Sequence, residues 1–188
     1  MENEELQSKK RAIELYDSGK INEFEVGTTK GLKQIHHFLF QDVFDFAGEV
    51  RDVDLAKGNF RFAPVIYLND TLKTIDNLPD ENYDEIIKKY VEMNVAHPFR
   101  EGNGRATRIW LDQMLKKKLG KCIDWSKVEK EKYLSAMERS PVNDLEIKTL
   151  LEGALTSDID NREVYMKGIQ SSYEYEEQSD YDVHNLTD

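Results

Sequence analysis

Apolar residues recur along the chain at intervals of three and four, the spacing that places them on one face of a helix. One such stripe follows Thr28, a residue suited to cap a helix N-terminus. Another stripe ends at His97-Pro98, because a proline disfavours helical geometry in the residue before it. The pattern predicts helices over residues 7–17, 28–41, 67–78, 82–96, 105–119, 127–139 and 144–155.

Residues 53–62 break this helical pattern. Apolar residues alternate with polar ones on both sides of Gly58-Asn59, which is typical of a β-hairpin. A lone hairpin in a helical chain is marginal by itself, and its exposed edge could align an extended substrate segment by strand addition. It could equally be a solvated connection between two helices, and the pattern alone favours neither. The residues concerned are Lys57, Gly58, Asn59, Phe60, Arg61 and Phe62.

Together these elements predict an all-α fold with one small β-hairpin. The 188 residues allow one domain with a sizeable core. We find no internal repeat, no low-complexity segment and no linker that would divide the chain.

The chain is acidic, with a formal net charge of -11. Residues 171–188 carry six acids and no Lys or Arg, so -6 comes from this stretch and -5 from the rest. Nucleic acid and anionic membrane surfaces repel such a chain, so neither is an expected partner. A protein partner, or a nucleotide held in a local basic pocket, fits better, and a homo-oligomer stays open.

The compartment can be predicted from what the sequence lacks. Cys122 is the only cysteine, so an intrachain disulfide is impossible. The first residues show no basic region followed by an apolar run, and no apolar stretch approaches the length of a membrane span. A soluble cytoplasmic protein is therefore predicted. Delivery by a secretion system that needs no cleaved signal stays open.

Residues 97–108 have the sequence HPFREGNGRATR, which gathers residue types suited to chemistry on a polyphosphate. Gly102 and Gly104 lack a Cβ, so the backbone N–H groups around them can approach an anion closely. They precede the helix predicted from residue 105, and a helix N-terminus favours phosphate. Arg105 and Arg108 share one face of that helix, where two guanidinium groups suit phosphate oxygens.

Two further side chains of this stretch can take part in chemistry. His97 could accept a proton near neutral pH, and Glu101 could hold a divalent cation. Alone, a His before Pro or a Gly-Asn-Gly turn is usually a helix boundary, with roughly a one-in-ten chance of being catalytic. All of these groups in one loop-to-helix junction are hard to attribute to packing. The stretch is neither a Walker loop, which needs Gly-Lys-Ser/Thr, nor a Rossmann glycine loop, which follows a strand.

His36 and His37 lie within the predicted helix 28–41. No cysteine or acid cluster at metal-ligand spacing accompanies them. A packing or surface role is therefore favoured for both, at roughly four to one.

The stretch 97–108 resembles the signature of the Fic family, HPFx(D/E)GNGRxxR, and meets every specified position. Weaker similarity covers residues 32–155. The resemblance implies a mainly helical Fic fold, here residues 1–159, and transfer of AMP from ATP to a protein hydroxyl. It also implies that the hairpin is a flap over the active site, where it positions the target chain.

The resemblance assigns a role to each residue of the signature. His97 would be the base that activates a Tyr, Thr or Ser hydroxyl, which is a poor nucleophile at neutral pH. Glu101 would help to bind Mg²⁺. The phosphates of ATP would be held by the backbone of Gly102 and Gly104 and by the side chains of Asn103, Arg105 and Arg108.

Residues 160–188 mix acids with apolar and aromatic residues, which indicates that part of this acidic tail docks. One Fic class carries an inhibitory helix at its C-terminus with the pattern (S/T)xxxE(G/N), and residues 172–176 match its first five positions. Ser172 and Glu176 are thereby implied to be inhibitory, with Glu176 beside Arg108. Glu177 stands where the pattern has Gly or Asn.

Several alternatives accompany this hypothesis. Tyr173 and Tyr175 lie beside the inhibitory glutamate and are candidate sites of self-modification. The relative Doc, which resembles a kinase, has Lys where Gly104 stands here, so Gly104 argues against phosphate transfer. The same site could instead remove AMP or transfer another phosphate-containing group. An inactive nucleotide-binding regulator is the non-enzymatic alternative, disfavoured by the intact signature. Type II topoisomerase subunits are candidate targets only by association with bacterial homologues of this size.

Overall fold

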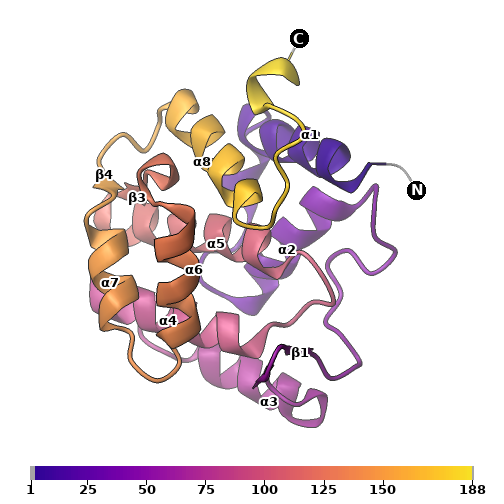
Figure 1. Cartoon of the computed structure of the whole chain (residues 1–188), viewed down its shortest axis with the longest axis vertical. Coiled ribbons are helices and arrows are strands. Elements are labelled where there is room, and N and C mark those ends of the chain that lie inside the picture. Colours follow the sequence, from indigo (N-terminus) through magenta and orange to yellow (C-terminus); the bar gives the residue numbers. More distant parts are fainter. Residues whose placement is uncertain (1–2, 188) are drawn as a thin grey trace.

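Helix α5 (Asn103–Leu119) runs through the centre of the molecule, and the other helices lie around it (Figure 1). Its residues Trp110, Leu111 and Leu115 are fully buried. The structure is a computed structural model and describes residues 3–187. The remaining helices are α1 (Glu4–Asp17), α2 (Thr29–Phe40), α3 (Val65–Asp76), α4 (Tyr83–Ala96), α6 (Lys130–Arg139), α7 (Leu145–Glu152) and α8 (Arg162–Glu174).

The mainly helical fold that the sequence predicts is confirmed. Side chains cap the helices that frame the signature loop: Thr28 accepts a hydrogen bond from the N–H of Gly31 at 3.1 Å, and Asn82 accepts one from Glu85 at 2.9 Å. The apolar stripe after Thr28 lies in the core, as its period indicates. None of the helices within residues 3–187 has the length and apolar character needed to cross a bilayer.

Three local features differ from the predicted elements, the first being that the helix predicted over residues 144–155 ends at Glu152. The helix predicted over residues 127–139 begins only at Lys130, because residues 125–127 form a short 3-10 turn capped by the side chain of Asp124. Strands β3 (Cys122–Ile123) and β4 (Leu155–Thr156) form a second small antiparallel pair, which was not predicted. Strands of two residues are too short to show a period-two alternation in sequence.

The C-terminal segment packs back against α1 (Figure 1). The ammonium group of Lys9 is fully buried, where it pairs with Glu5 at 2.7 Å and donates to the carbonyl of Tyr181 at 2.6 Å. The hydroxyl of Tyr165 on α8 donates to the carbonyl of Ala12 at 2.7 Å. Residues 160–187 are therefore docked on the helical body well beyond the end of α8.

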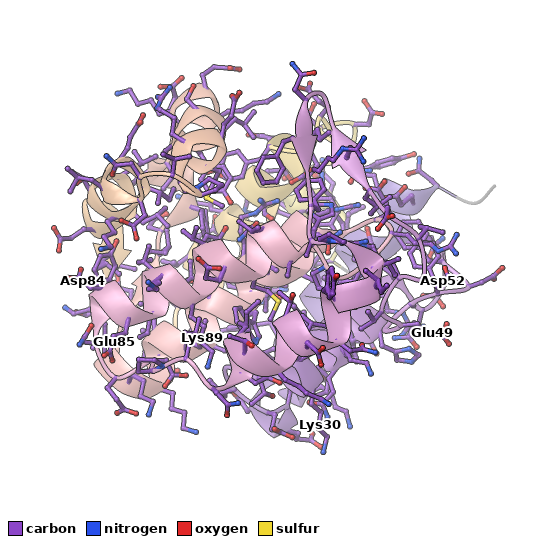
Figure 2. All side chains as sticks on the ribbon, turned by 90° about the horizontal axis from the view of Figure 1, so that it is seen from below. Lys30, Glu49, Asp52, Asp84, Glu85 and Lys89 are labelled. Carbon is purple, nitrogen blue, oxygen red and sulfur yellow. The ribbon has the colours of Figure 1, made fainter. Side chains whose placement is uncertain are left out.

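The predicted hairpin is present, with two short strands β1 (Ala56–Lys57) and β2 (Phe60–Arg61). It stands out from the helices in Figure 2, close to the exposed loop that carries Asp52. Gly58 in the turn has a φ of +60°, which residues with a Cβ rarely adopt. Just beyond β2, the N–H of Ala63 donates to the carbonyl of Val95 at 3.1 Å, so the second stem is attached to the end of α4.

Candidate active site

His97 marks the point where α4 ends and the signature loop begins. It adopts a φ of +50°, a left-handed conformation in which His, Asn and Asp are the commonest residues after Gly. Its N–H still donates to the carbonyl of Met93 at 3.0 Å, and Pro98 then prevents the helix from continuing. The imidazole ring stacks on Phe62 of the hairpin, with ring centroids 3.7 Å apart.

This packing keeps His97 neutral. Burial, together with the charges of Arg51 and Lys57, lowers the pKa of His97 to about 4. The negative charge of Glu176 acts to raise the pKa of His97. Since an unprotonated imidazole can accept a proton, the ring is in the form that a general base requires at pH 7.

The loop after His97 turns sharply into α5 at Gly102. This residue has a φ of +85°, and a Cβ placed on it would come within 2.5 Å of the ring of Phe40. Only glycine fits there. The loop is closed by Asn103, whose side chain accepts from the N–H of Phe99 at 2.9 Å and donates to its carbonyl at 2.6 Å. The side chain of Asn103 therefore shapes the loop in this structure, and a direct contact with phosphate stays a prediction.

His36 supports the loop from behind. Its Nδ1 accepts a hydrogen bond from the N–H of Gly48 at 2.9 Å, so Nε2 carries the proton and donates to the carbonyl of Glu101 at 2.8 Å. Its ring stacks on Phe99 with centroids 3.8 Å apart. Burial lowers the pKa of His36 to about 4. His36 therefore has the packing role that the sequence favoured. The structure adds that this packing supports the signature loop, which could not be seen in the sequence.

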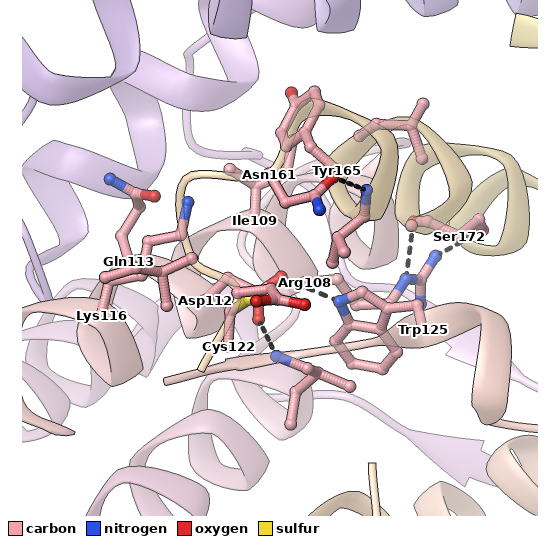
Figure 3. A pocket seen from close by; sticks show the side chains of 16 residues that line it. Arg108, Ile109, Asp112, Gln113, Lys116, Cys122, Trp125, Asn161, Tyr165 and Ser172 are labelled. Carbon is pink, nitrogen blue, oxygen red and sulfur yellow. Dashed lines mark hydrogen bonds between the residues drawn. The ribbon is translucent and has the colours of Figure 1, made fainter. Parts of the chain in front are cut away.

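Arg108 lies one turn into α5 and is almost fully buried. Its guanidinium donates to the hydroxyl of Ser172 at 2.7 Å and to the carbonyl of the same residue at 2.9 Å (Figure 3). It also pairs with Glu176 at 2.9 Å and donates to the hydroxyl of Tyr133 at 3.2 Å. Glu176 therefore lies beside Arg108, as the C-terminal pattern predicts, and Ser172 contacts the same guanidinium. The inhibitory role of both residues stays a prediction.

The carboxylate of Glu176 lies at the N-terminal turn of α5. A Cβ on Gly104 would come within 2.5 Å of its Oε1 atom. Burial acts to raise the pKa of Glu176, but the attraction of Arg108 outweighs it and holds the pKa below its usual range. An ionised carboxylate therefore occupies the place where a helix N-terminus and an arginine would attract a phosphate.

Arg105 is held by both ends of the chain. Its guanidinium pairs with Glu4 of α1 at 2.7 Å and donates to the side-chain oxygen of Gln178 at 2.8 Å. Glu101 lies 3.6 Å away. Arg105 and Arg108 both lie on α5, three residues apart, and both guanidinium groups are engaged with other side chains in this structure.

Among the residues predicted to bind ATP or its metal, Glu101 has the exposed side chain, at 62%. No group of three or more His, Cys, Asp or Glu within residues 3–187 is arranged to hold a metal ion. A single exposed carboxylate suits Mg²⁺ that arrives with a nucleotide, because Mg²⁺ keeps several waters and takes its other ligands from phosphate oxygens.

The two tyrosines proposed for self-modification are core residues. Tyr173 is 1% exposed and Tyr175 is 4% exposed, and the hydroxyl of Tyr175 donates to the carbonyl of Val128 at 2.6 Å. Neither hydroxyl can reach a nucleotide while α8 is docked. Self-modification at these two positions therefore requires that the end of α8 first leaves the core.

Below α8 lies a cavity of about 40 Å³, which Figure 3 shows from close by. Asp112 accepts there from the indole N–H of Trp125 at 2.9 Å and from the N–H of Ile123 at 2.8 Å. Burial raises the pKa of Asp112 to about 6. The cavity is of the size of a water molecule or two and is far too small for a nucleotide.

Glu177, the residue that departs from the C-terminal pattern, has a φ of +61°. Its neighbour Gln178 donates from its N–H to the carbonyl of Tyr173 at 2.9 Å, which is the bond that closes a helix in a left-handed cap. Gly and Asn adopt this conformation most easily. The last position of the pattern is thus a helix cap, and a glutamate occupies it here at a cost in strain.

Replacing Glu177 by Gly should therefore stabilise the docked end of α8. We expect a gain of about 1 kcal/mol, which corresponds to a rise of about 2–4 °C in Tm. The surface pair of Glu177 with Lys130 is lost in this variant, but such exposed pairs contribute little. Thermal unfolding measures the change, with Glu177→Ala as the control that loses the pair and keeps the Cβ. Equal Tm values for the two variants would contradict the cap.

Two residues that support the site, His36 and Arg51, were not predicted from the sequence. His36 lies among the buried residues of α2. Because a buried histidine needs hydrogen-bond partners, its position beside the apolar stripe was the signal in the sequence that it binds another part of the chain. The sequence around Arg51 does not indicate its role, because it lies in a loop, where no periodic pattern of apolar residues marks a buried position. Its guanidinium donates to the carbonyl of His97 at 2.7 Å.

The site and the fold define a class: helical domains in which a histidine and a glycine-rich loop adjoin a helix N-terminus that carries two arginines. The sequence model of the Fic/DOC family matches residues 27–115. Over these residues the chain is therefore similar to the Fic/DOC family.

Curated relatives agree with this assignment. The chain is 34% identical over 125 residues to "Probable protein adenylyltransferase Fic" of Escherichia coli K12, a match that covers 61% of this chain and 62% of the relative. It is 32% identical over 164 residues to the "Protein adenylyltransferase VbhT" of Bartonella schoenbuchensis, covering 77% of this chain and 34% of the relative. The chain thus spans less than two thirds of the length of either protein.

Solved structures share the fold. The N-terminal Fic domain of a VirB-translocated effector from Bartonella quintana, with bound ADP, has a TM-score of 0.67 and 22% identity, covering 80% of this chain and 81% of the other. The BepC protein of Bartonella tribocorum, with bound AMPPNP, has a TM-score of 0.65 and 21% identity, covering 77% and 82%. These likenesses show that the helical arrangement is that of Fic domains.

Proposed function

We propose that this protein transfers AMP from ATP to a hydroxyl side chain of a target protein. The observation that carries the proposal is the junction of α4 and α5, where a neutral His97 adjoins an anion-binding helix N-terminus that bears Arg105 and Arg108. The curated relatives named protein adenylyltransferases and the complete signature support it.

The chemistry follows from the positions of these groups. The hydroxyl oxygen of the target forms a bond to the α-phosphorus of ATP, and its proton passes to the unprotonated ring nitrogen of His97. The bond between the α-phosphorus and the bridging oxygen breaks, and pyrophosphate leaves with the electron pair. The backbone N–H groups at Gly102 and Gly104 and the two arginines hold the negative charge of the phosphates.

Mg²⁺ fits the same site. It would be held by Glu101 together with phosphate oxygens, and when bound it neutralises charge on the leaving pyrophosphate. The side chain of Glu101 is 62% exposed, so a metal that arrives with a nucleotide can reach its carboxylate from solvent.

The hairpin is proposed to position the target. Phe62 packs on His97, and Phe60 contacts Phe62 edge-on while remaining 37% exposed. A target segment added along the short strands would therefore lie beside the ring that takes its proton. The target protein can be identified in a lysate, and type II topoisomerase subunits are the first candidates to try.

Glu176 is proposed to hold the protein in an inhibited state. Its carboxylate pairs with Arg108 and lies against Gly104, so it competes with the phosphates of ATP for the same donors. A nucleotide bound in the presence of this carboxylate would not present its α-phosphate to His97. The unmodified protein should therefore be nearly inactive.

The proposed function is tested with labelled ATP and a cell lysate. We expect α-label, and no γ-label, to appear on protein in the presence of Mg²⁺, and neither after addition of EDTA. Because the parent protein is expected to be inhibited, Glu176→Gly is assayed beside it. Transfer of γ-label would show a kinase instead, and loss of α-label from a premodified target would show AMP removal. Nucleotide binding without any transfer would leave an inactive regulator.

A further inference from the structure

Arg51 forms an unusual set of contacts for a buried arginine. Its side chain is 3% exposed, and no carboxylate within residues 3–187 lies within 4 Å of its guanidinium. Four of its five N–H donors are directed at backbone carbonyls instead. They reach His97 at 2.7 Å, Ala96 at 3.0 Å, Val53 at 2.6 Å and Ala63 at 2.6 Å.

These four carbonyls belong to two different parts of the site. Those of Ala96 and His97 are at the C-terminus of α4, where carbonyls lack partners within the helix and a cation is favourable. Those of Val53 and Ala63 lie on the two stems of the hairpin, one before β1 and one after β2. One planar guanidinium thus joins both stems of the hairpin to the residue proposed as the base.

The backbone near Arg51 strengthens this connection. Its N–H donates to the carbonyl of Pro98 at 2.8 Å, so the loop before the hairpin is attached on the other side of His97 as well. His97 adopts its left-handed conformation between these two attachments. Phe62 can stack on His97 only when the hairpin and the loop keep the relative position that these attachments set.

We infer that Arg51 is a positioning residue, which fixes the conformation of His97 and couples it to the hairpin that receives the target chain. This inference rests on the proposed function. Lys cannot replace Arg51, because a single ammonium group cannot span four carbonyls in the directions that a guanidinium fork reaches. The phosphate-binding groups do not contact Arg51, so the loss of Arg51 should affect transfer and leave ATP binding nearly intact.

The test uses Arg51→Lys and Arg51→Ala in the activated Glu176→Gly background. We expect kcat to fall about tenfold in Arg51→Lys and about a hundredfold in Arg51→Ala, while KM for ATP stays within about twofold of the parent. Guanidinium at millimolar concentration should partly restore kcat in Arg51→Ala. Arg100→Lys is the matched control, because this neighbouring arginine pairs with Asp52 at the surface and should behave as the parent.

A pH profile gives a readout that a purely structural role would not change. The charged groups that face His97 are Arg51, Lys57 on β1 and Glu176 at the end of α8. With Glu176 removed in the background, Arg51→Ala takes away one of the two cations. The acid limb of kcat should therefore move to higher pH in Arg51→Ala and stay in place in Arg51→Lys.

A measurement independent of activity separates this inference from the proposed function. Hydrogen exchange at the N–H of Ala63, which donates to Val95, should accelerate in both Arg51 variants and remain unchanged in Arg100→Lys. If the Glu176→Gly parent transferred no label, the proposed function would fail. The exchange measurement would still test whether Arg51 holds the hairpin against the end of α4. Unchanged kcat and exchange would overturn the inference. So would equal losses of kcat and ATP affinity without rescue, or a failure of both variants to fold.

Discussion

Replacing Glu176 by glycine should raise the rate of AMP transfer by about one to three powers of ten. The pair between Glu176 and Arg108 joins a buried guanidinium to a carboxylate whose side chain is 34% exposed. Partly desolvated pairs of this kind contribute about 2–4 kcal/mol, and exposure places this one toward the lower end. Without the carboxylate, Arg108 and the N-terminus of α5 become available to the outer phosphates. The measurement is the initial rate of α-label transfer at saturating ATP.

A matched control is available on the same helix end. Glu174→Gly introduces the same flexibility at the last turn of α8, but Glu174 is exposed and has no ion pair with Arg108. We expect its activity to equal that of the unmodified protein. Glu177→Gly, which relieves the strained cap, should leave the protein inhibited or inhibit it further. Equal activation by the glycine at 174 and at 176 would mean that a loose helix end, and not the carboxylate, controls activity.

The contiguous part of the site could be predicted from the sequence. The helices were predicted from signals that depend only on residues close together in the chain, namely the helix period, the cap at Thr28 and the break at Pro98. Each helix that these signals define is present in the structure. The signature residues are likewise neighbours along the chain, so a single stretch reveals them. The pairing of Arg108 with Glu176 spans 68 positions, and only the family pattern made it predictable.

The supporting contacts could not be predicted in this way. His36 reaches the loop across 65 positions, and Arg51 reaches His97 across 46. Both bind backbone carbonyls, and any residue can provide a carbonyl, so no partner residue type marks these contacts in the sequence. The same reason hides the cap at Glu177, because its left-handed backbone becomes visible only in the structure. Tertiary contacts to the backbone are therefore the part of this site that only the structure reveals.

Replacing His97 by alanine should abolish AMP transfer and leave ATP binding largely intact. In the proposed reaction the imidazole takes the proton of the attacking hydroxyl, and general-base catalysis contributes about 10²- to 10⁴-fold to a rate. The groups proposed to hold the nucleotide lie beyond it, at Gly102, Arg105 and Arg108. The measurements are α-label transfer in the Glu176→Gly background and the Kd for ATP by calorimetry.

The conformation of His97 determines which variants make this test conclusive. Because its φ is +50°, alanine adds backbone strain that asparagine largely avoids. His97→Asn keeps the left-handed conformation but provides no base, so it should lose transfer as fully as His97→Ala while retaining more stability. His37→Ala is the control, since His37 is an exposed histidine whose one side-chain hydrogen bond within residues 3–187 is to the carbonyl of Ala47. Full activity in His97→Asn would remove His97 from the chemistry and leave it a purely structural residue at the end of α4.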